Sequence, residues 1–265
     1  MISYNLGEYI LLKGINNMKI NEMKQAIKDF YRPNNYGLKK YLVKDGKEHP
    51  FAIICPGGGY SMVCSFVEGE PYAKALNKLG YHAFVVYYRV RGKAQYPNPQ
   101  LDLQRAINYV FSKAKEWNLC TNNWSLWGSS AGGHLVSSFC MEDYKTPLPT
   151  ALILSYPVIT LGEYTHIETR NNILGENLNK EMIDKLSVEK HITSNYPPTY
   201  VWYGTADNLV NPINSIMLGD ALTKAGVINK VEKFEGVVHG AGLALKTNAE
   251  GWLNNAVAFW EEQSK

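Results

Sequence analysis

The segment Gly128-Ser129-Ser130-Ala131-Gly132 decides the fold of this 265-residue chain. It matches the pattern G-x-S-x-G, and it lies between an apolar run at 124–127 and a stretch of helical patterning at 131–141. A strand, a sharp turn and a helix around such a serine form a nucleophile elbow, and small neighbours two residues away permit its strained backbone. We therefore expect Ser130 to be a nucleophile above the edge of a sheet. Ser129 lies in the wrong register for that position.

Short apolar runs alternate with helical stretches from about residue 40 onward. Such runs lie at 51–55, 82–88, 124–127, 151–155, 199–203 and 230–234, and most of them are nearly continuous in apolar character, as strands covered on both faces are. Helices are expected at 71–79, 101–117, 131–141, 213–225 and 251–262. This alternation predicts an α/β fold with a doubly wound, mostly parallel sheet of about eight strands and helices on both faces. The alternating run at 39–43 suits an antiparallel edge strand.

A glycine-rich loop, Pro56-Gly57-Gly58-Gly59-Tyr60, directly follows the expected strand at 51–55. Three consecutive glycines cost backbone entropy, so they indicate a loop whose N–H groups approach a ligand more than an ordinary tight turn. We expect an oxyanion hole with the N–H groups of Gly58, Gly59 and Ala131 as donors. Tyr60 is considered as a contact for the acyl or sugar part of a substrate, with a place in the core as the alternative.

The acid and the base are expected at the ends of two further strands. Asp207 follows the run at 199–203, whereas the competing Asp220 lies within a helical pattern. Of the six histidines, only His239 satisfies the chain order serine, acid, histidine. If the strands are parallel, the glycine loop, Ser130, Asp207 and His239 gather at the carboxyl edge of the sheet, where ligand sites of open α/β sheets lie.

Several motifs resemble those of the esterase/lipase branch of the α/β-hydrolases, on the side of the acetyl and acetylxylan esterases. The resemblance covers roughly residues 50 to 260 and includes Pro56-Gly-Gly-Gly-Tyr60, Glu68-Gly-Glu-Pro71, Tyr96-Pro-Asn-Pro99, Gly128-Ser-Ser-Ala-Gly-Gly-His134, Ser155-Tyr-Pro-Val158 and Gly204-Thr-Ala-Asp207. It implies the α/β-hydrolase fold and the triad Ser130, Asp207 and His239. Many relatives carry His-Gly-Gly-Gly at the glycine loop, and Cys55-Pro56 in its place favours the sugar-esterase side over the lipases.

Composition and charge exclude several classes of protein. The net charge is +3, and no Lys/Arg run exceeds a pair such as Lys39-Lys40, so no nucleic-acid partner is expected. The four cysteines lie in no CxxC or zinc-like spacing, which argues against a metal and for reduced thiols. No window approaches 18 apolar residues and the N-terminus has no signal pattern, so we expect a cytoplasmic protein without a membrane partner. The glycine loop lacks a following Lys-Ser/Thr, and no cofactor is expected.

We expect one domain over residues 1–265, in which the long stretch at 157–197 forms a small lid or cap insertion. A structural excursion without substrate contact is the alternative for this stretch. Residues 20–30 could form a helix, or the first 35 residues a leading strand. The expected function is a serine carboxylesterase for small, acetyl esters of sugars or oligosaccharides. The alternatives are a serine peptidase of the prolyl-oligopeptidase type and a non-catalytic binding protein of the same fold. The sequence leaves open whether the protein forms a homo-oligomer.

Overall fold

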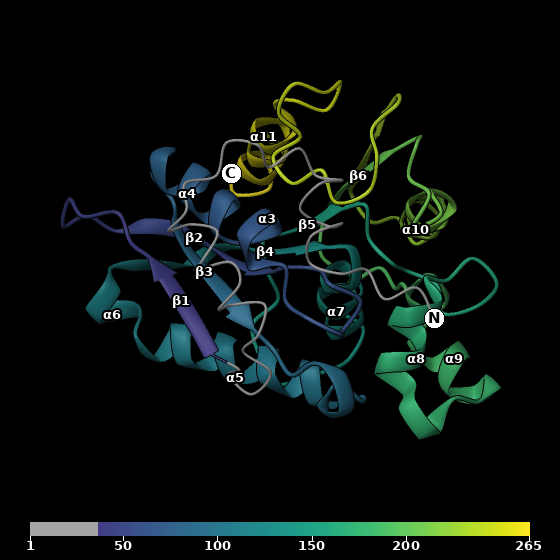
Figure 1. Cartoon of the computed structure of the whole chain (residues 1–265). Helices are drawn as coiled ribbons and strands as arrows, with labels where there is room; N and C mark the ends of the chain where they lie inside the picture. Colours follow the sequence, from purple (N-terminus) through teal and green to yellow (C-terminus); the bar gives the residue numbers. More distant parts are fainter. Residues whose placement is uncertain (1–36) are drawn as a thin grey trace, which may run out of the picture. The chain divides into compact units, whose positions relative to one another are not determined.

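A computed structural model describes residues 37–265, in which seven strands form one sheet (Figure 1). The strands follow the spatial order β1-β3-β2-β4-β5-β6-β7. Their bounds are β1 Gly37–Tyr41, β2 His49–Cys55, β3 His82–Tyr87, β4 Leu119–Ser129, β5 Ala151–Ser155, β6 Thr199–Gly204 and β7 Asn229–Phe234. Strand β1 pairs with β3 in antiparallel fashion, and every other pairing is parallel. The predicted doubly wound sheet is confirmed. An eighth strand, or a helix at 20–30, would lie outside the described residues.

Helices cover both faces of this sheet. In the described residues they are α3 Ser65–Glu68, α4 Glu70–Lys78, α5 Asn98–Ser112, α6 Ala114–Trp117, α7 Ser130–Phe139, α8 Ile167–Leu174, α9 Lys180–Leu186, α10 Ile213–Lys224 and α11 Trp252–Glu262. Short 3-10 turns lie at Arg91–Lys93, Gly175–Asn177 and Val188–Lys190. Because side chains of a strand alternate between faces, the two faces build two separate cores.

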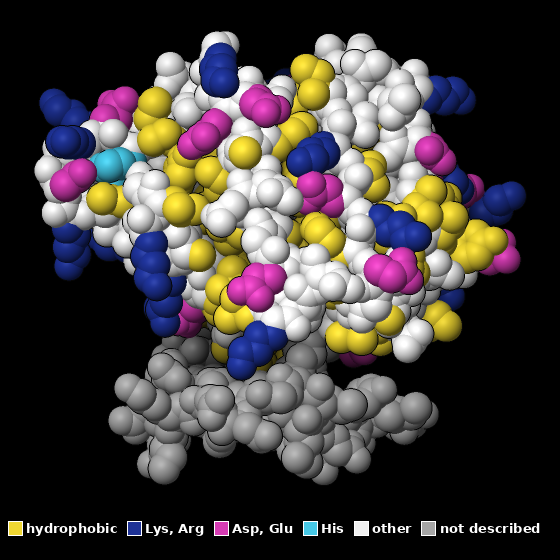
Figure 2. Space-filling model, turned by 90° about the horizontal axis from the view of Figure 1, so that it is seen from above, with side chains coloured by type: hydrophobic (Ala, Val, Ile, Leu, Met, Phe, Trp, Pro, Cys, Tyr) yellow, Lys and Arg dark blue, Asp and Glu magenta, His cyan; other side chains and the backbone are white. Residues whose placement is uncertain are grey.

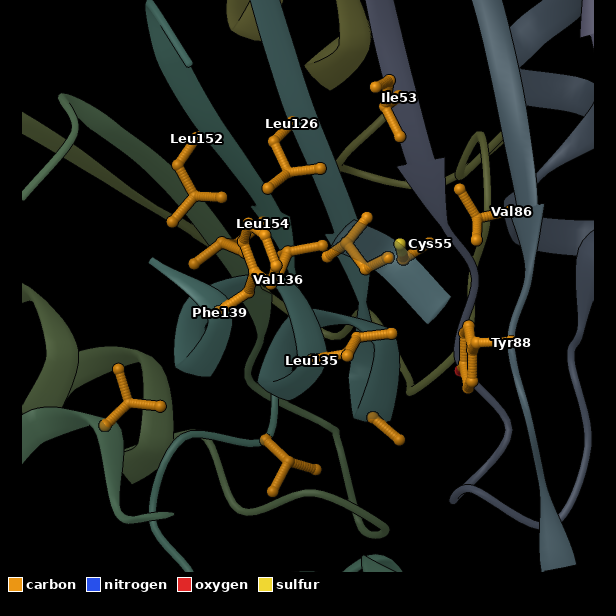
Figure 3. Close-up of a cluster of buried hydrophobic side chains, with 14 of the residues drawn as sticks. Ile53, Cys55, Val86, Tyr88, Leu126, Leu135, Val136, Phe139, Leu152 and Leu154 are labelled. Atoms are coloured by element: carbon orange, nitrogen blue, oxygen red, sulfur yellow. The ribbon is translucent and has the colours of Figure 1, made fainter. Parts of the chain in front are cut away.

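The core on the α5 and α7 face contains Ile53 of β2, Leu126 of β4 and Leu154 of β5 (Figure 3). These side chains are fully buried and pack against Leu135 and Val136 of α7. The opposite core contains the next residue of β2, Ile54, with Trp127 of β4 and the aromatic side chains of α11. Both cores together hold the parallel strands in register, so that their carboxyl ends meet at one edge.

Helix α7 begins unusually close to the end of β2, and glycine makes this approach possible. A Cβ atom on Gly132 would lie 2.1 Å from the carbonyl oxygen of Cys55 and 2.4 Å from that of Pro56. A Cβ atom on Gly128 would lie 2.5 Å from the carbonyl oxygen of Gly132. The contact therefore fixes the position at which the helix leaves the sheet, directly beside the glycine loop.

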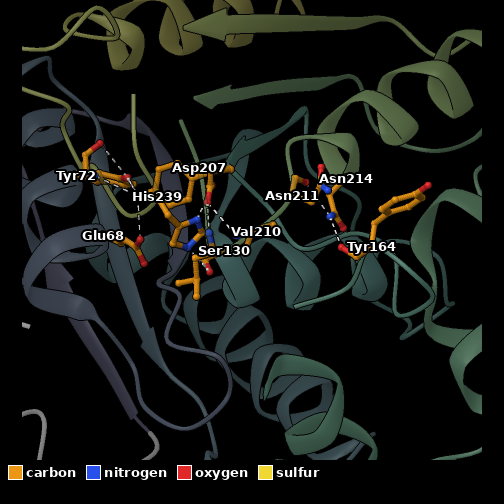
Figure 4. Close-up of polar contacts among 12 residues, drawn as sticks. Glu68, Tyr72, Ser130, Tyr164, Asp207, Val210, Asn211, Asn214 and His239 are labelled. Atoms are coloured by element: carbon orange, nitrogen blue, oxygen red, sulfur yellow. Dashed lines mark hydrogen bonds and ion pairs between the residues drawn. The ribbon is translucent and has the colours of Figure 1, made fainter. Parts of the chain in front are cut away.

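The stretch between β5 and β6 that was expected to be a lid carries α8 and α9. Its first residues are tied to α10 by Asn214, whose Oδ1 accepts the N–H groups of Ile159 at 2.9 Å and Thr160 at 3.0 Å. The Asn214 amide also donates to the carbonyl oxygen of Tyr164 at 2.9 Å (Figure 4). This buried asparagine anchors the base of the insertion to the sheet domain.

Lys, Arg, Asp and Glu side chains are interspersed among apolar ones on the face that Figure 2 presents, and no stripe of one sign runs across that face. Among residues 37–265, no helix combines the length and the apolar character needed to cross a bilayer.

Replacing Gly132 with alanine tests the close approach of α7 to β2. The added methyl group has no room against two carbonyl oxygens, so we expect the free energy of unfolding to fall by about 1–3 kcal/mol, as for other overpacked sites. Urea unfolding followed by circular dichroism measures it. The matched control is Gly92→Ala, since a Cβ there meets nothing within 4 Å; it should stay within about 0.5 kcal/mol of the unsubstituted chain. Equal stability of both variants would contradict the packing account.

Candidate active site

Ser130 lies on a strained turn between β4 and α7. Ser129 is still extended, with φ −118° and ψ 140°, whereas Ser130 adopts φ 53° as the first residue of the helix. An L-residue in this left-handed region costs roughly 1–2 kcal/mol, and the surrounding structure has to compensate for it. The turn lifts the Ser130 hydroxyl above the carboxyl edge of the sheet, which is the geometry that the G-x-S-x-G pattern predicts.

A chain of hydrogen bonds joins Ser130, His239 and Asp207 (Figure 4). The Asp207 carboxylate accepts from Nδ1 of His239 at 2.7 Å, and this bond requires the proton on Nδ1. Nε2 of His239 therefore accepts from the Ser130 hydroxyl, 2.9 Å away. This is the tautomer in which an imidazole can remove the proton of a serine.

Asp207 is itself held in place by the backbone. Its second oxygen, Oδ1, accepts the N–H groups of Leu209 and Val210, each at 2.9 Å. The Asp207 side chain is 1% exposed and the His239 side chain 12% exposed. Since Asp207 follows β6 and His239 follows β7, the neighbouring strands bring both residues to the edge where β4 delivers Ser130. Asp220, the competing acid, is exposed on α10.

The glycine loop passes directly over this serine. A Cβ atom on Gly57 would lie 2.7 Å from Cβ of Ser130, so only glycine permits the contact. Gly58 has φ 126° and Gly59 has φ 61°, backbone conformations that favour glycine. Within residues 37–265, the N–H groups of Gly58 and Gly59 have no hydrogen-bond acceptor. Ala131 lies in the first turn of α7, where N–H groups lack a partner within the helix.

The expectation that Tyr60 contacts the substrate is wrong, because the structure does not bring the Tyr60 side chain to the site. It is fully buried and packs edge-on against Tyr88. Its hydroxyl donates to Nδ1 of His134 at 2.9 Å, while Nε2 of His134 donates to the carbonyl oxygen of Leu186 at 2.9 Å. Burial lowers the pKa of His134 to about 4, which keeps the ring neutral. The pair links the glycine loop to the nucleophile helix and the insertion.

Part of the insertion borders the glycine loop. The side-chain amide of Asn172 donates to the carbonyl oxygen of Gly59 at 2.7 Å. A Cβ atom on Gly59 would lie 3.6 Å from Cε1 of His166 and 3.7 Å from Oε2 of Glu168, so both side chains stand beside the loop. Burial lowers the pKa of His166, the nearby Glu168 carboxylate opposes this shift, and His239 adds to it.

Sequence reasoning did not assign His166, Glu168 or Asn172 to the site. It also did not find a cluster of buried polar side chains that lies behind the site. Glu68 and Tyr72 lie next to the His239 loop (Figure 4). Tyr156 joins this group through its hydrogen bonds with Glu68 and with the N–H group of Gly242. Glu68 and Tyr156 do occur in the motifs Glu68-Gly-Glu-Pro71 and Ser155-Tyr-Pro-Val158, and that was the signal available for finding them. No cluster of three or more potential metal ligands occurs in the described part of the chain.

The chain is similar in sequence to a known xylanase and to known esterases. The sequence model of the BD-FAE family matches residues 38–153. Endo-1,4-beta-xylanase B of Butyrivibrio fibrisolvens is 29% identical over 89% of this chain, and acetylxylan esterase of Xylanibacter ruminicola is 34% identical over 64%. The chain spans only 41% and 36% of the length of these two relatives.

A solved enzyme structure is similar to this structure over most of the chain. The acetyl ester-xyloside bifunctional hydrolase from Caldicellulosiruptor lactoaceticus superposes with a TM-score of 0.78 and is 33% identical in sequence. The alignment covers 87% of this chain and 89% of that enzyme. The likeness therefore shows a shared fold over most of the chain.

Proposed function

The chain belongs to the esterase/lipase branch of the α/β-hydrolases, and on that premise we propose that it is a serine esterase that removes small acyl groups, above all acetyl, from sugars or oligosaccharides. The observation that carries the proposal is the hydrogen-bonded chain Ser130, His239 and Asp207 beside a glycine loop in which the N–H groups of Gly58 and Gly59 have no acceptor within residues 37–265. The names of the acetylxylan esterase and of the acetyl ester-xyloside hydrolase support the substrate class.

Acylation begins when the Ser130 Oγ attacks the ester carbonyl carbon and Nε2 of His239 takes the hydroxyl proton. The carbonyl electrons move onto oxygen, and the N–H groups of Gly58, Gly59 and Ala131 are the donors proposed to bind this oxyanion. Asp207 holds the imidazole and stabilises its positive charge. Because the Gly57 N–H is already bonded to Glu68, it does not belong to the donor set.

The bond to the alcohol then breaks, and His239 returns its proton to the departing sugar oxygen. The product is an acyl-enzyme on Ser130. A water molecule attacks the acyl carbon while His239 again accepts a proton, and collapse of the second tetrahedral species releases the carboxylic acid and restores Ser130.

We further propose that the insertion at 157–197 lines the substrate side of this site. The contacts of His166, Glu168 and Asn172 with the glycine loop support this role. The Glu168 carboxylate is exposed and accepts no hydrogen bond within residues 37–265. A carboxylate in that position is an acceptor for hydroxyl groups, of which a sugar ester carries several and a simple aryl ester none.

Replacing Ser130 with alanine removes the nucleophile and leaves the base and the donors in place. We expect kcat for nitrophenyl acetate to fall by roughly 10⁴- to 10⁶-fold. The thermal melting curve of the variant should show that the fold persists. A variant that keeps most of the activity would contradict the assignment of Ser130.

A panel of substrates tests the proposed function. Ser130 is only 6% exposed and the insertion borders the glycine loop, so a short acyl group should enter more easily than a long one. Acetyl esters, including acetylated xylo-oligosaccharides, should therefore be cleaved with a higher kcat/KM than octanoyl nitrophenyl ester or a peptide nitroanilide. Equal turnover of the octanoyl ester, or faster turnover of the peptide amide, would contradict the proposal.

Replacing Glu168 with glutamine tests the role of the insertion. We expect the ratio of kcat/KM for acetylated xylo-oligosaccharide to that for nitrophenyl acetate to fall roughly five- to tenfold, or about 1–1.4 kcal/mol. This is the loss expected when a hydrogen bond to a charged acceptor is replaced by one to the neutral oxygen of glutamine. Glu176→Gln is the matched control, because Glu176 is an exposed glutamate just beyond the other end of α8. An unchanged ratio in Glu168→Gln, or the same loss in the control, would show that Glu168 does not contact the sugar.

A further inference from the structure

Glu68, at the end of α3, is a buried carboxylate for which the reaction steps above provide no task. It is 4% exposed, and no Lys, Arg or His forms an ion pair with it among residues 37–265. Burying a carboxyl group without a partner is costly, so a carboxyl group in such a place depends on the hydrogen bonds that it receives.

The two oxygens of Glu68 face two different parts of the site. Oε2 accepts the N–H group of Gly57, in the glycine loop, at 2.8 Å. Oε1 accepts the hydroxyl of Tyr156, just after β5, at 2.9 Å. Glu68 therefore bonds directly to the loop that carries the proposed oxyanion donors, and to a tyrosine on the opposite side.

Tyr156 extends this connection to the loop that carries His239. Its hydroxyl oxygen accepts the N–H group of Gly242 at 3.1 Å, three residues after His239. Its ring packs edge-on against the His239 imidazole, with 4.8 Å between the ring centroids. The carbonyl group of Gly242 is held as well. Its oxygen accepts the hydroxyl of Tyr72 at 3.2 Å and the indole N–H of Trp252 at 3.0 Å.

We propose that Glu68 is a positioning residue that fixes the oxyanion loop and the His239 loop relative to each other, through Gly57 on one side and Tyr156 on the other. The proposal rests on the serine esterase function proposed above. In this role Glu68 acts through Gly57 and Tyr156 and not on the substrate itself. Its effect is geometric: the donors and the base must meet the same tetrahedral intermediate, and small displacements between them slow the reaction steeply.

The chemistry of the bonds explains why a carboxylate suits this position. Both Gly57 and Tyr156 present hydrogens to Glu68, so two acceptors are needed. A glutamine has one acceptor oxygen and one amide that only donates, and one of the two bonds must therefore be lost or reversed. Tyr156→Phe breaks the same connection at its other end, because it removes the hydroxyl that joins Glu68 to Gly242.

Steady-state kinetics of Glu68→Gln, Tyr156→Phe and the double variant test the proposal on nitrophenyl acetate, together with the rate of labelling by a fluorophosphonate. We expect kcat and the labelling rate to fall about tenfold or more in each single variant, with KM within about twofold, since positioning acts on the transition state. In the double variant, kcat should fall by a smaller factor than the product of the factors measured for the two single variants, because both substitutions break the same hydrogen-bond network. Glu70→Gln is the matched control. Glu70 lies on α4 and pairs with Lys39 of β1 instead of the site, so this variant should keep the kcat of the unsubstituted chain.

A kcat of Glu68→Gln within about twofold of the unsubstituted chain, or fully multiplicative losses in the double variant, would overturn this inference alone. A loss of kcat that only follows a loss of folded protein in the melting curve would also overturn it. If Glu68→Gln does not fold, Tyr156→Phe decides by the same kcat and KM criteria. A folded unsubstituted chain that neither cleaves the ester nor reacts with the fluorophosphonate would instead overturn the proposed function, and this inference with it.

Discussion

The close approach between the glycine loop and the start of α7 is the constraint on which the site depends. Ser130 can hold φ 53° only because the backbone around it is packed on all sides, with Gly132 against the end of β2 and Gly57 against Ser130 itself. No side chain larger than hydrogen fits at either glycine. The same contact that maintains the strained turn also brings the glycine loop next to Ser130, and the N–H groups of Gly58 and Gly59 in this loop lack an acceptor within residues 37–265.

The other polar groups of the site surround this contact on several sides. The carboxyl ends of β6 and β7 bring Asp207 and His239 to the serine, and backbone N–H groups hold the Asp207 carboxylate in one orientation. Behind them, Glu68 and Tyr156 connect the glycine loop to the His239 loop. Polar side chains of the insertion lie beside the glycine loop. The geometry near Ser130 is therefore maintained by several elements that lie far apart in the sequence.

The strands, their mostly parallel pairing and the strand-end residues could be predicted because they follow from local patterns. Apolar runs, helical stretches and the chain order of Ser130, Asp207 and His239 are all visible in the sequence, and parallel pairing brings strand ends together. The direction of the Tyr60 side chain could not be predicted, since it depends on a left-handed backbone at that residue and on His134, 74 positions away. Glu68 was missed for a similar reason: its partners are a backbone N–H and a tyrosine 88 positions away, and a glutamate in a short helix ordinarily indicates a solvated face.

Peptide mapping by mass spectrometry after reaction with a fluorophosphonate tests the central claim most directly, because it identifies the nucleophile by its covalent bond. The account predicts one adduct per chain, located on Ser130 and absent from Ser129 in the same peptide. It also predicts that His239→Ala slows formation of this adduct strongly, since the serine then has no base. An adduct on another residue, or none on a folded chain, would contradict the account.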